Sequence, residues 1–222
     1  MDRKIIVTED NSKTLLIPSI NETYHSTHGA FNEAIHVFID AGLKELKTNK
    51  IRVFEMGFGT GLNALVTLDY AIQNKIDIEF TSIEKYPLQA ETVQALEYPS
   101  KVNPALSAYF DKMHASEWNK LTEIHPRFSL KKIEGGVETL ATENNYYDVV
   151  YFDAFGPRVQ PELWSVDVLK KMYDHLKQNG ILVTYCAQGQ FKRNLKAAGF
   201  EMENLPGPPG KREMTRGIKP VQ

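Results

Sequence analysis

The feature that most constrains the fold is a glycine-rich loop between a predicted strand and a predicted helix. Residues 51–56 are expected to form the strand and residues 62–74 the helix, and between them lies Gly57-Phe58-Gly59-Thr60-Gly61. Glycines let the backbone turn sharply and approach a ligand closely, because no Cβ stands in the way. A strand, a glycine loop and a helix in this order indicate a site for a nucleoside-containing cofactor.

Strands and helices alternate along most of the chain. Residues 147–152 are nearly all apolar or aromatic, which is typical of a strand buried on both faces. The pattern predicts an α/β fold with a doubly wound, mainly parallel sheet. Residues 97–125 give no clear assignment. The other expected elements are strands over 78–83, 128–133 and 181–185, helices over 87–95, 162–177 and 191–198, and an antiparallel edge hairpin from 200–205 and 214–218.

Two acidic residues favour S-adenosylmethionine over a dinucleotide as the cofactor. Glu55 stands just before the first glycine, where a carboxylate attracts an ammonium or sulfonium charge and repels a pyrophosphate. Glu84 ends the second strand about 20 residues past the loop, which is where an acidic residue accepts hydrogen bonds from ribose hydroxyls. The expected cofactor-binding residues here are Glu55, Gly57, Gly59, Gly61, Asn63 and Glu84.

Asp153 is the candidate catalytic residue. It follows the strand over 147–152, and doubly wound sheets bind ligands at the carboxyl ends of their strands. A carboxylate there can hold an amine nucleophile and take its proton. A turn-forming role is the alternative for Asp153, since Asp is common in turns. Phe155 is expected beside a flat substrate base, with core packing as its alternative, whereas Trp164 is expected in the core.

Length and composition point to one domain with an N-terminal addition. The chain has 222 residues, a single cysteine (Cys186) and no apolar run of the roughly 20 residues that would cross a bilayer. Its start lacks a secretory signal, and we therefore expect a cytoplasmic protein. Residues 1–48 are expected to form a small hairpin and a helix over 29–46 packed on the main domain, and residues 49–222 to form the domain that binds S-adenosylmethionine.

Six blocks of sequence resemble the methyltransferase half of the MnmC family of bacterial tRNA-modifying enzymes. The Glu55–Asn63 and Lys211–Met214 strings are the most specific. The other blocks are residues 24–30, 36–39, 84–88 and 152–157. The resemblance implies a class I Rossmann-like methyltransferase that N-methylates the aminomethyl group of 5-aminomethyl-2-thiouridine at the tRNA wobble position. It also implies Asp153 near the amine and Glu84 on the ribose.

The chain departs from this family pattern in three places, one of which is a mild change: family members often read A-F-A-P where this chain has Ala154-Phe155-Gly156-Pro157. The bifunctional family members carry a flavin-dependent oxidase domain, for which these residues leave no room, so we expect no flavin and no oxidase activity. After the third strand many relatives place an acidic residue that binds adenine, but here the sequence reads Gly135-Gly136. Gly136 is thus expected to meet the cofactor through its backbone only, with Glu138 as a further candidate for adenine.

RNA binding would have to rely on a local surface, because the formal net charge is −2. Lys211 and Arg212 follow a Pro-rich turn and are expected to meet phosphates of the anticodon stem-loop, with a solvated loop as the alternative. The C-terminal stretch adds further candidate cations for this surface, namely Lys192, Arg193, Lys196, Arg216 and Lys219.

Other interpretations compete with the wobble-base methyltransferase. A small-molecule amine methyltransferase or aminopropyltransferase fits the same scaffold, since fold does not determine function. A non-catalytic nucleoside- or tRNA-binding module is a third possibility, which an intact Asp153 disfavours. His25, His28 and His36 do not have metal-ligand spacing, and no metal is expected. Tyr24, His25 and Ser26 are either a lid over the cofactor or an ordinary loop.

Overall fold

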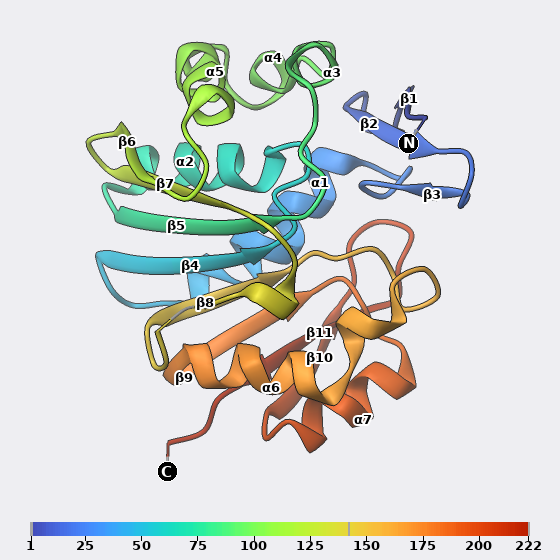
Figure 1. The fold of residues 1–222 in the computed structure, drawn as a ribbon, viewed down its shortest axis with the longest axis vertical. Helices are drawn as coiled ribbons and strands as arrows, with labels where there is room; N and C mark the ends of the chain where they lie inside the picture. The colour runs from blue at the N-terminus through green and yellow to red at the C-terminus, as the bar shows by residue number, and fades with distance from the viewer. Residues whose placement is uncertain (1, 142, 222) are drawn as a thin grey trace.

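The molecule is built around one eight-stranded sheet, seen in a computed structural model that describes residues 2–141 and 143–221 (Figure 1). The strand order is β10-β11-β9-β8-β4-β5-β7-β6. Parallel pairing joins β9, β8, β4, β5 and β7, whereas β11, β10 and β6 pair antiparallel at the two edges. The strands are β4 (Lys50–Met56), β5 (Asp77–Glu84), β6 (Leu121–His125), β7 (Phe128–Glu134), β8 (Tyr147–Phe152), β9 (Leu176–Thr184), β10 (Glu201–Pro206) and β11 (Glu213–Ile218).

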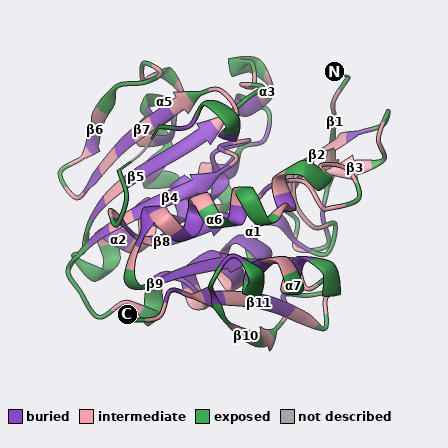
Figure 2. Ribbon diagram, turned by 60° about the horizontal axis from the view of Figure 1, so that its bottom comes forward, coloured by how far each residue is buried: buried purple, intermediate pink, exposed green. Residues whose placement is uncertain are grey.

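Helices cover both faces of this sheet and bury its central strands, as the doubly wound prediction requires (Figure 2). One face packs against α1 (Ala30–Ala34), its π-helical continuation η1 (Ile35–Asp40), α2 (Leu62–Asn74) and α5 (Ser107–Ala115). The other face packs against α6 (Val166–His175) and α7 (Gly189–Ala197). The remaining helical segments are η2 (Leu43–Glu45), α3 (Ala90–Gln94), α4 (Tyr98–Val102), η3 (Pro104–Leu106), η4 (Val137–Thr139) and η5 (Pro161–Trp164).

The N-terminal residues form a separate three-stranded sheet beside the main one (Figure 1). Its strands are β1 (Lys4–Val7), β2 (Lys13–Ile17) and β3 (Glu22–Thr23). Leu15 from β2 and Phe38 from η1 belong to the same hydrophobic core as the main sheet, and the Phe38 ring lies 4.9 Å from the ring of Tyr151. These contacts place β2 and η1 against the main sheet.

The order of the strands reverses between β4 and β8. The chain runs from β4 through β5 to β7 on one side, and then crosses to β8 on the other side of β4. At this switch point the backbone of Asp153 meets the glycine loop, because the Asp153 N–H donates to the Met56 carbonyl at 3.2 Å. Open α/β sheets bind ligands in the crevice that such a reversal leaves.

Several expected boundaries were wrong. The helix predicted over 29–46 is α-helical only at Ala30–Ala34 and continues as π- and 3-10 turns. The helix predicted from residue 162 begins at Val166, because the Ser165 hydroxyl caps it by accepting from the Val168 N–H. Strands β3 and β6 were not predicted. The edge hairpin β10–β11 is confirmed.

Candidate active site

The carboxyl ends of the central strands open into one large cavity. Its volume is about 920 Å³, within the range of roughly 300–1,000 Å³ typical of ligand sites. The cavity is lined by the glycine loop, the end of β5, the turn after β7, the segment after β8, and residues of the N-terminal sheet. Most of the predicted site residues meet here: Gly57, Gly59, Asn63, Glu84, Gly136, Asp153, Phe155 and Lys211.

The glycine loop takes backbone conformations that suit glycine. Gly57, Gly59 and Gly61 have φ values of 95°, 49° and 75°. A Cβ on Gly61 would lie 2.6 Å from the His114 ring nitrogen Nε2, so no larger residue fits without movement. Gly61 itself supports the loop from behind, whereas Gly57 and Gly59 face the cavity.

Glu84 fixes the loop against the neighbouring strand. Its carboxylate accepts from the Gly59 N–H at 2.9 Å and from the Tyr86 N–H at 2.7 Å. Each carboxylate oxygen has a second lone pair, so both stay able to accept a ribose hydroxyl. The cavity volume, the glycine cradle and this carboxylate together fit the nucleoside part of S-adenosylmethionine.

Glu55 does not line the cavity. Its side chain is fully buried behind the loop and accepts a hydrogen bond from the Ser82 hydroxyl at 2.6 Å. Burial raises the pKa of Glu55 well above its usual range. The structure thus gives Glu55 no direct contact with a ligand in the cavity.

Asp153 lies deep in the cavity beside the loop. Asn63 donates from Nδ2 to the Asp153 carboxylate at 2.8 Å, and this bond orients the carboxylate. Burial, and then the nearby charge of Glu33, raise the pKa of Asp153 from 3.8 to about 7. A carboxyl group with such a pKa can exchange protons near neutral pH, as a general base requires.

Aromatic residues cover the loop and Asp153. Tyr24 from the N-terminal segment lies over Gly59, and its ring meets Phe155 edge-to-face at a centroid distance of 5.2 Å. Tyr24, His25 and Ser26 all line the cavity, which matches the lid interpretation of this segment. Trp164 is buried in the core, as expected, and its indole N–H donates to the Phe155 carbonyl at 2.8 Å.

The turn after β7 forms part of the cavity rim. Gly136 lines the cavity, and a side chain there would collide with the Glu138 carboxylate. Glu138 pairs with the Lys85 ammonium at 2.9 Å and also lines the cavity. Because Glu138 is exposed and can move, this contact does not by itself require glycine at 136, and the rim offers backbone groups and one carboxylate.

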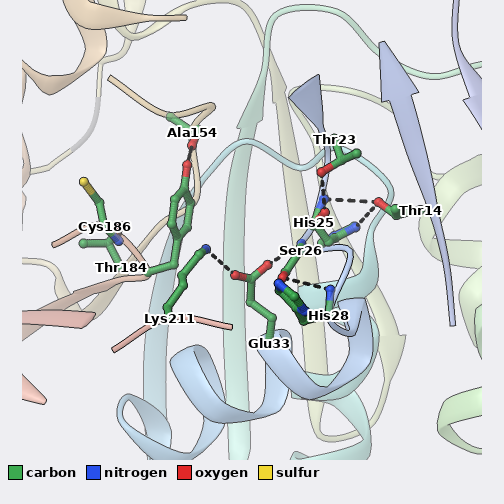
Figure 3. Close-up of polar contacts among 11 residues, drawn as sticks. Thr14, Thr23, His25, Ser26, His28, Glu33, Ala154, Thr184, Cys186 and Lys211 are labelled. Carbon is green, nitrogen blue, oxygen red and sulfur yellow. Dashed lines mark hydrogen bonds and ion pairs between the residues drawn. The ribbon is translucent and has the colours of Figure 1, made fainter. Parts of the chain in front are cut away.

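Lys211 was expected to face RNA phosphates, but the structure does not place it on the outer surface. Its ammonium reaches into the cavity and pairs with the Glu33 carboxylate at 2.6 Å (Figure 3). The other oxygen of Glu33 accepts from the Ser26 N–H. Arg212 is exposed and lies outside the cavity.

Most of the other cations of the C-terminal stretch are also engaged within the chain. Lys192 pairs with Glu213, and Arg216 pairs with Glu203 and Glu45. Lys219 is buried and donates to backbone carbonyls. The cations of this stretch that stay exposed are Arg193, Lys196 and Arg212.

Sequence reasoning missed Glu33 and Tyr185. Ala30, Ala34 and Val37 mark the buried stripe of the helix, and Glu33 falls on the same stripe at helical spacing. An acidic residue on a buried face is a signal in itself, because a buried charge needs a partner. Tyr185 directly follows β9 and thus lies at the same edge of the sheet as Asp153.

No group of three or more His, Cys, Asp or Glu side chains among the described residues could hold a metal ion. His28 bonds to Glu9 and His36 to the Pro206 carbonyl.

Among the described residues, no helix has the length and apolar character needed to cross a membrane.

The fold and the site together define a Rossmann-like, nucleoside-cofactor-dependent transferase. Residues 97–220, more than half of the chain, match the family described as S-adenosyl-L-methionine-dependent methyltransferase. The chain belongs to this family, and its cofactor is S-adenosylmethionine.

Known proteins resemble the chain over nearly all its length. It is 32% identical over 218 residues to the tRNA 5-methylaminomethyl-2-thiouridine biosynthesis bifunctional protein MnmC of Burkholderia multivorans, which covers 92% of this chain and 33% of that protein. The MnmC of Leptospira interrogans is 29% identical, covering 96% of this chain and 35% of that protein. This chain thus spans about a third of these relatives' length. The crystal structure of MnmC2 from Aquifex aeolicus superposes with a TM-score of 0.75 at 25% identity, covering 100% of this chain and 73% of that one.

Proposed function

We propose that this chain N-methylates the aminomethyl group of 5-aminomethyl-2-thiouridine at the wobble position of tRNA, giving 5-methylaminomethyl-2-thiouridine. The observation that carries the proposal is Asp153, a carboxylate with a pKa of about 7 at the switch point of the sheet. The named activity of the MnmC relatives supports the substrate. The expected place of action is the cytoplasm.

In this proposal, the glycine loop and Glu84 hold the cofactor. Gly57 and Gly59 let the cofactor approach the loop backbone closely, and Glu84 accepts hydrogen bonds from the ribose hydroxyls. We expect the backbone at Gly136 and the Glu138 side chain to hold adenine, since both line the cavity. When bound, S-adenosylmethionine supplies an electrophilic methyl group.

Asp153 prepares the nucleophile. The substrate's aminomethyl group is an ammonium ion in water, and its nitrogen has a lone pair only after one proton leaves. The Asp153 carboxylate accepts that proton, and Asn63 keeps the accepting group in position. Because displacement at a methyl group depends on alignment, the positioning of Asp153 contributes directly to rate.

Aromatic groups and one exposed cation complete the proposed substrate site. Phe155, held by Tyr24 and by the Trp164 hydrogen bond, offers a ring for the uracil base. Arg212 remains exposed and suited to an RNA phosphate. Protein–RNA contacts of this kind place single-stranded loop bases in a pocket, and the wobble base belongs to such a loop.

Transfer of labelled methyl groups from S-adenosylmethionine tests the proposal. We expect transfer to tRNA that carries 5-aminomethyl-2-thiouridine and none to the same tRNA without the aminomethyl group. Comparable transfer to simple amines in the absence of RNA would instead support a small-molecule methyltransferase. Binding of tRNA without any transfer, in protein that binds the cofactor, would support a non-catalytic module.

A further inference from the structure

A buried ion pair occupies the substrate side of the cavity. Glu33 has a side chain only 8% exposed, and its two oxygens accept from the Lys211 ammonium at 2.6 Å and from the Ser26 N–H at 2.7 Å. Lys211 comes from the loop between β10 and β11, so the pair joins the two ends of the chain across the cavity (Figure 3). Both residues line the same cavity as Asp153.

The surroundings of the Lys211 ammonium are those of an alkylammonium site. The Nζ atom lies 3.9 Å from the centroid of the Tyr185 ring, in a cation–π contact. The Tyr185 hydroxyl donates to the Ala154 carbonyl at 2.8 Å, which holds this ring in place. Glu33 and Asp153 are near enough for their charges to interact, so two carboxylates and one aromatic face act on a single cation.

Replacing Lys211 by another ammonium ion should cost less free energy than removing Lys211 alone. If Lys211 moved away alone, a buried carboxylate would be left unpaired, and an uncompensated buried charge is strongly unfavourable. A second ammonium arriving beside Asp153 would replace the lost partner and keep Glu33 neutralised. Lys211 is 32% exposed on a loop at the cavity edge, so its stem has room to move outward.

We propose that Glu33 binds the amino group to be methylated, and that Lys211 holds this position until the substrate displaces it. The ligand class is a primary or secondary alkylammonium ion. Its identification with the aminomethyl group of the wobble base rests on the proposed function. Glu33 then binds the ammonium ion while Asp153 accepts its proton, so the two carboxylates have separate tasks.

The test replaces Lys211 and supplies a small cation. Lys211→Met keeps the length of the stem and removes the charge, so its thermal midpoint should fall below that of the wild type without cofactor or RNA. Methylammonium chloride should raise this midpoint saturably beyond the effect of equal sodium chloride. Tetramethylammonium, which has no N–H to donate, should not. The Glu33→Gln/Lys211→Met double variant is the matched control and should not respond to methylammonium.

Besides a Lys211→Met variant that does not respond to methylammonium, two results would overturn the inference. The first is a methylammonium effect of equal size in the wild type, the single variant and the double variant, which would mean that no site exists. The second is Glu33→Gln with an unchanged KM for the nucleoside 5-aminomethyl-2-thiouridine, because the inference expects a rise of roughly tenfold or more, the scale of a lost hydrogen bond to a charged group. If Lys211→Met folds poorly, refolding yields in methylammonium and in sodium chloride give the same comparison.

The cation test is independent of the proposed function, since it needs neither RNA nor methyl transfer. A methylammonium response with no methylation of tRNA would remove the wobble base as substrate and leave the alkylammonium site in place. Methylation of tRNA with no methylammonium response in Lys211→Met would exclude the alkylammonium site and leave the proposed function in place.

Discussion

At the scale of single residues, the site is held together by carboxyl groups whose pKa values are shifted upward by burial. Asp153 and Glu55 lie on opposite sides of the glycine loop, with Asn63 between them. Only Asp153 faces the cavity. The two acids therefore differ in role. Both lie at the same edge of the sheet, Glu55 just before the end of β4 and Asp153 just after the end of β8.

Asp153→Asn should stabilise the fold while abolishing methyl transfer. A pKa raised from 3.8 to about 7 means that the folded state binds the proton more tightly than the unfolded state. The proton on Asp153 therefore contributes to the free energy of unfolding. This contribution is fully present below about pH 4 and is lost as the pH rises through about 7. At one pKa unit per about 1.4 kcal/mol, the variant should gain on the order of 2–4 kcal/mol at pH 8.

Denaturant unfolding of both proteins at pH 4 and pH 8 checks this expectation. The gain should be small at the lower pH and large at the higher one. An equal difference at both values would show that Asp153 titrates normally.

Glu55→Gln should keep activity, whereas Glu55→Ala should not. Oε1 of Glu55 and Oδ1 of Asn63 are buried acceptor atoms without a donor among the described residues. The amide of Gln supplies a donor at this position while its oxygen still accepts from the Ser82 hydroxyl. The Ala variant leaves Ser82 and Asn63 unsatisfied, a loss of about 1–3 kcal/mol. Chemical denaturation and kcat measurements on both variants test this, and a Gln variant as weak as Ala would contradict it.

At the scale of elements, the strand–loop–helix unit around residue 57 was the part most open to prediction. The glycines, the two strand ends and the buried strand over 147–152 depend on local pattern, and the structure confirms them. The π-helical η1 depends on packing against β9, and edge strand β6 shows no clean alternation. Neither leaves a local signal, and so both were missed.

The same reasoning explains which site residues could be found. Asp153 and Glu84 were recognisable because strand ends are visible in the sequence. The role of Lys211 was not, because its partner Glu33 lies 178 positions away in the chain. Long-range ion pairs depend on tertiary contacts, to which a local pattern gives no access.

Gly61→Ala should destabilise the loop and weaken cofactor binding. The backbone at Gly61 has φ of 75°, and the new Cβ would meet His114 Nε2 at 2.6 Å. Strain of this kind costs about 1–3 kcal/mol. Gly189→Ala is the control, since its Cβ would make only a 3.5 Å contact at the start of α7. Calorimetry with S-adenosylmethionine measures the effect, and equal affinities for the two variants would contradict the account.

At the scale of the whole molecule, we propose that residues 1–48 cover the site of the methyltransferase domain formed by residues 49–222. Tyr24 and Glu33 belong to the first segment, and Asp153 and Lys211 to the second. The cavity needs both segments, so the N-terminal addition is part of the site.

RNA contact is proposed to depend on Arg212, because Lys211 is paired within the cavity. Arg212→Ala should raise the KM for tRNA and lower the slope of log affinity against log salt by about 1, one phosphate contact. Affinity for S-adenosylmethionine should not change. Filter binding across a salt series measures the slope, and Lys120→Ala, exposed beside β6 at the opposite edge of the sheet, serves as the control and should leave the slope unchanged. An unaltered slope for Arg212→Ala would move the RNA-binding surface elsewhere.

The central claim is tested most directly by mass spectrometry of nucleosides from tRNA incubated with this protein and S-adenosylmethionine. The account predicts that 5-aminomethyl-2-thiouridine is converted to 5-methylaminomethyl-2-thiouridine by the wild type. Asp153→Ala should slow this conversion by roughly 100-fold or more, the scale of a lost acid–base group. An unchanged nucleoside profile with cofactor-bound wild-type protein, or full conversion by Asp153→Ala, would contradict it.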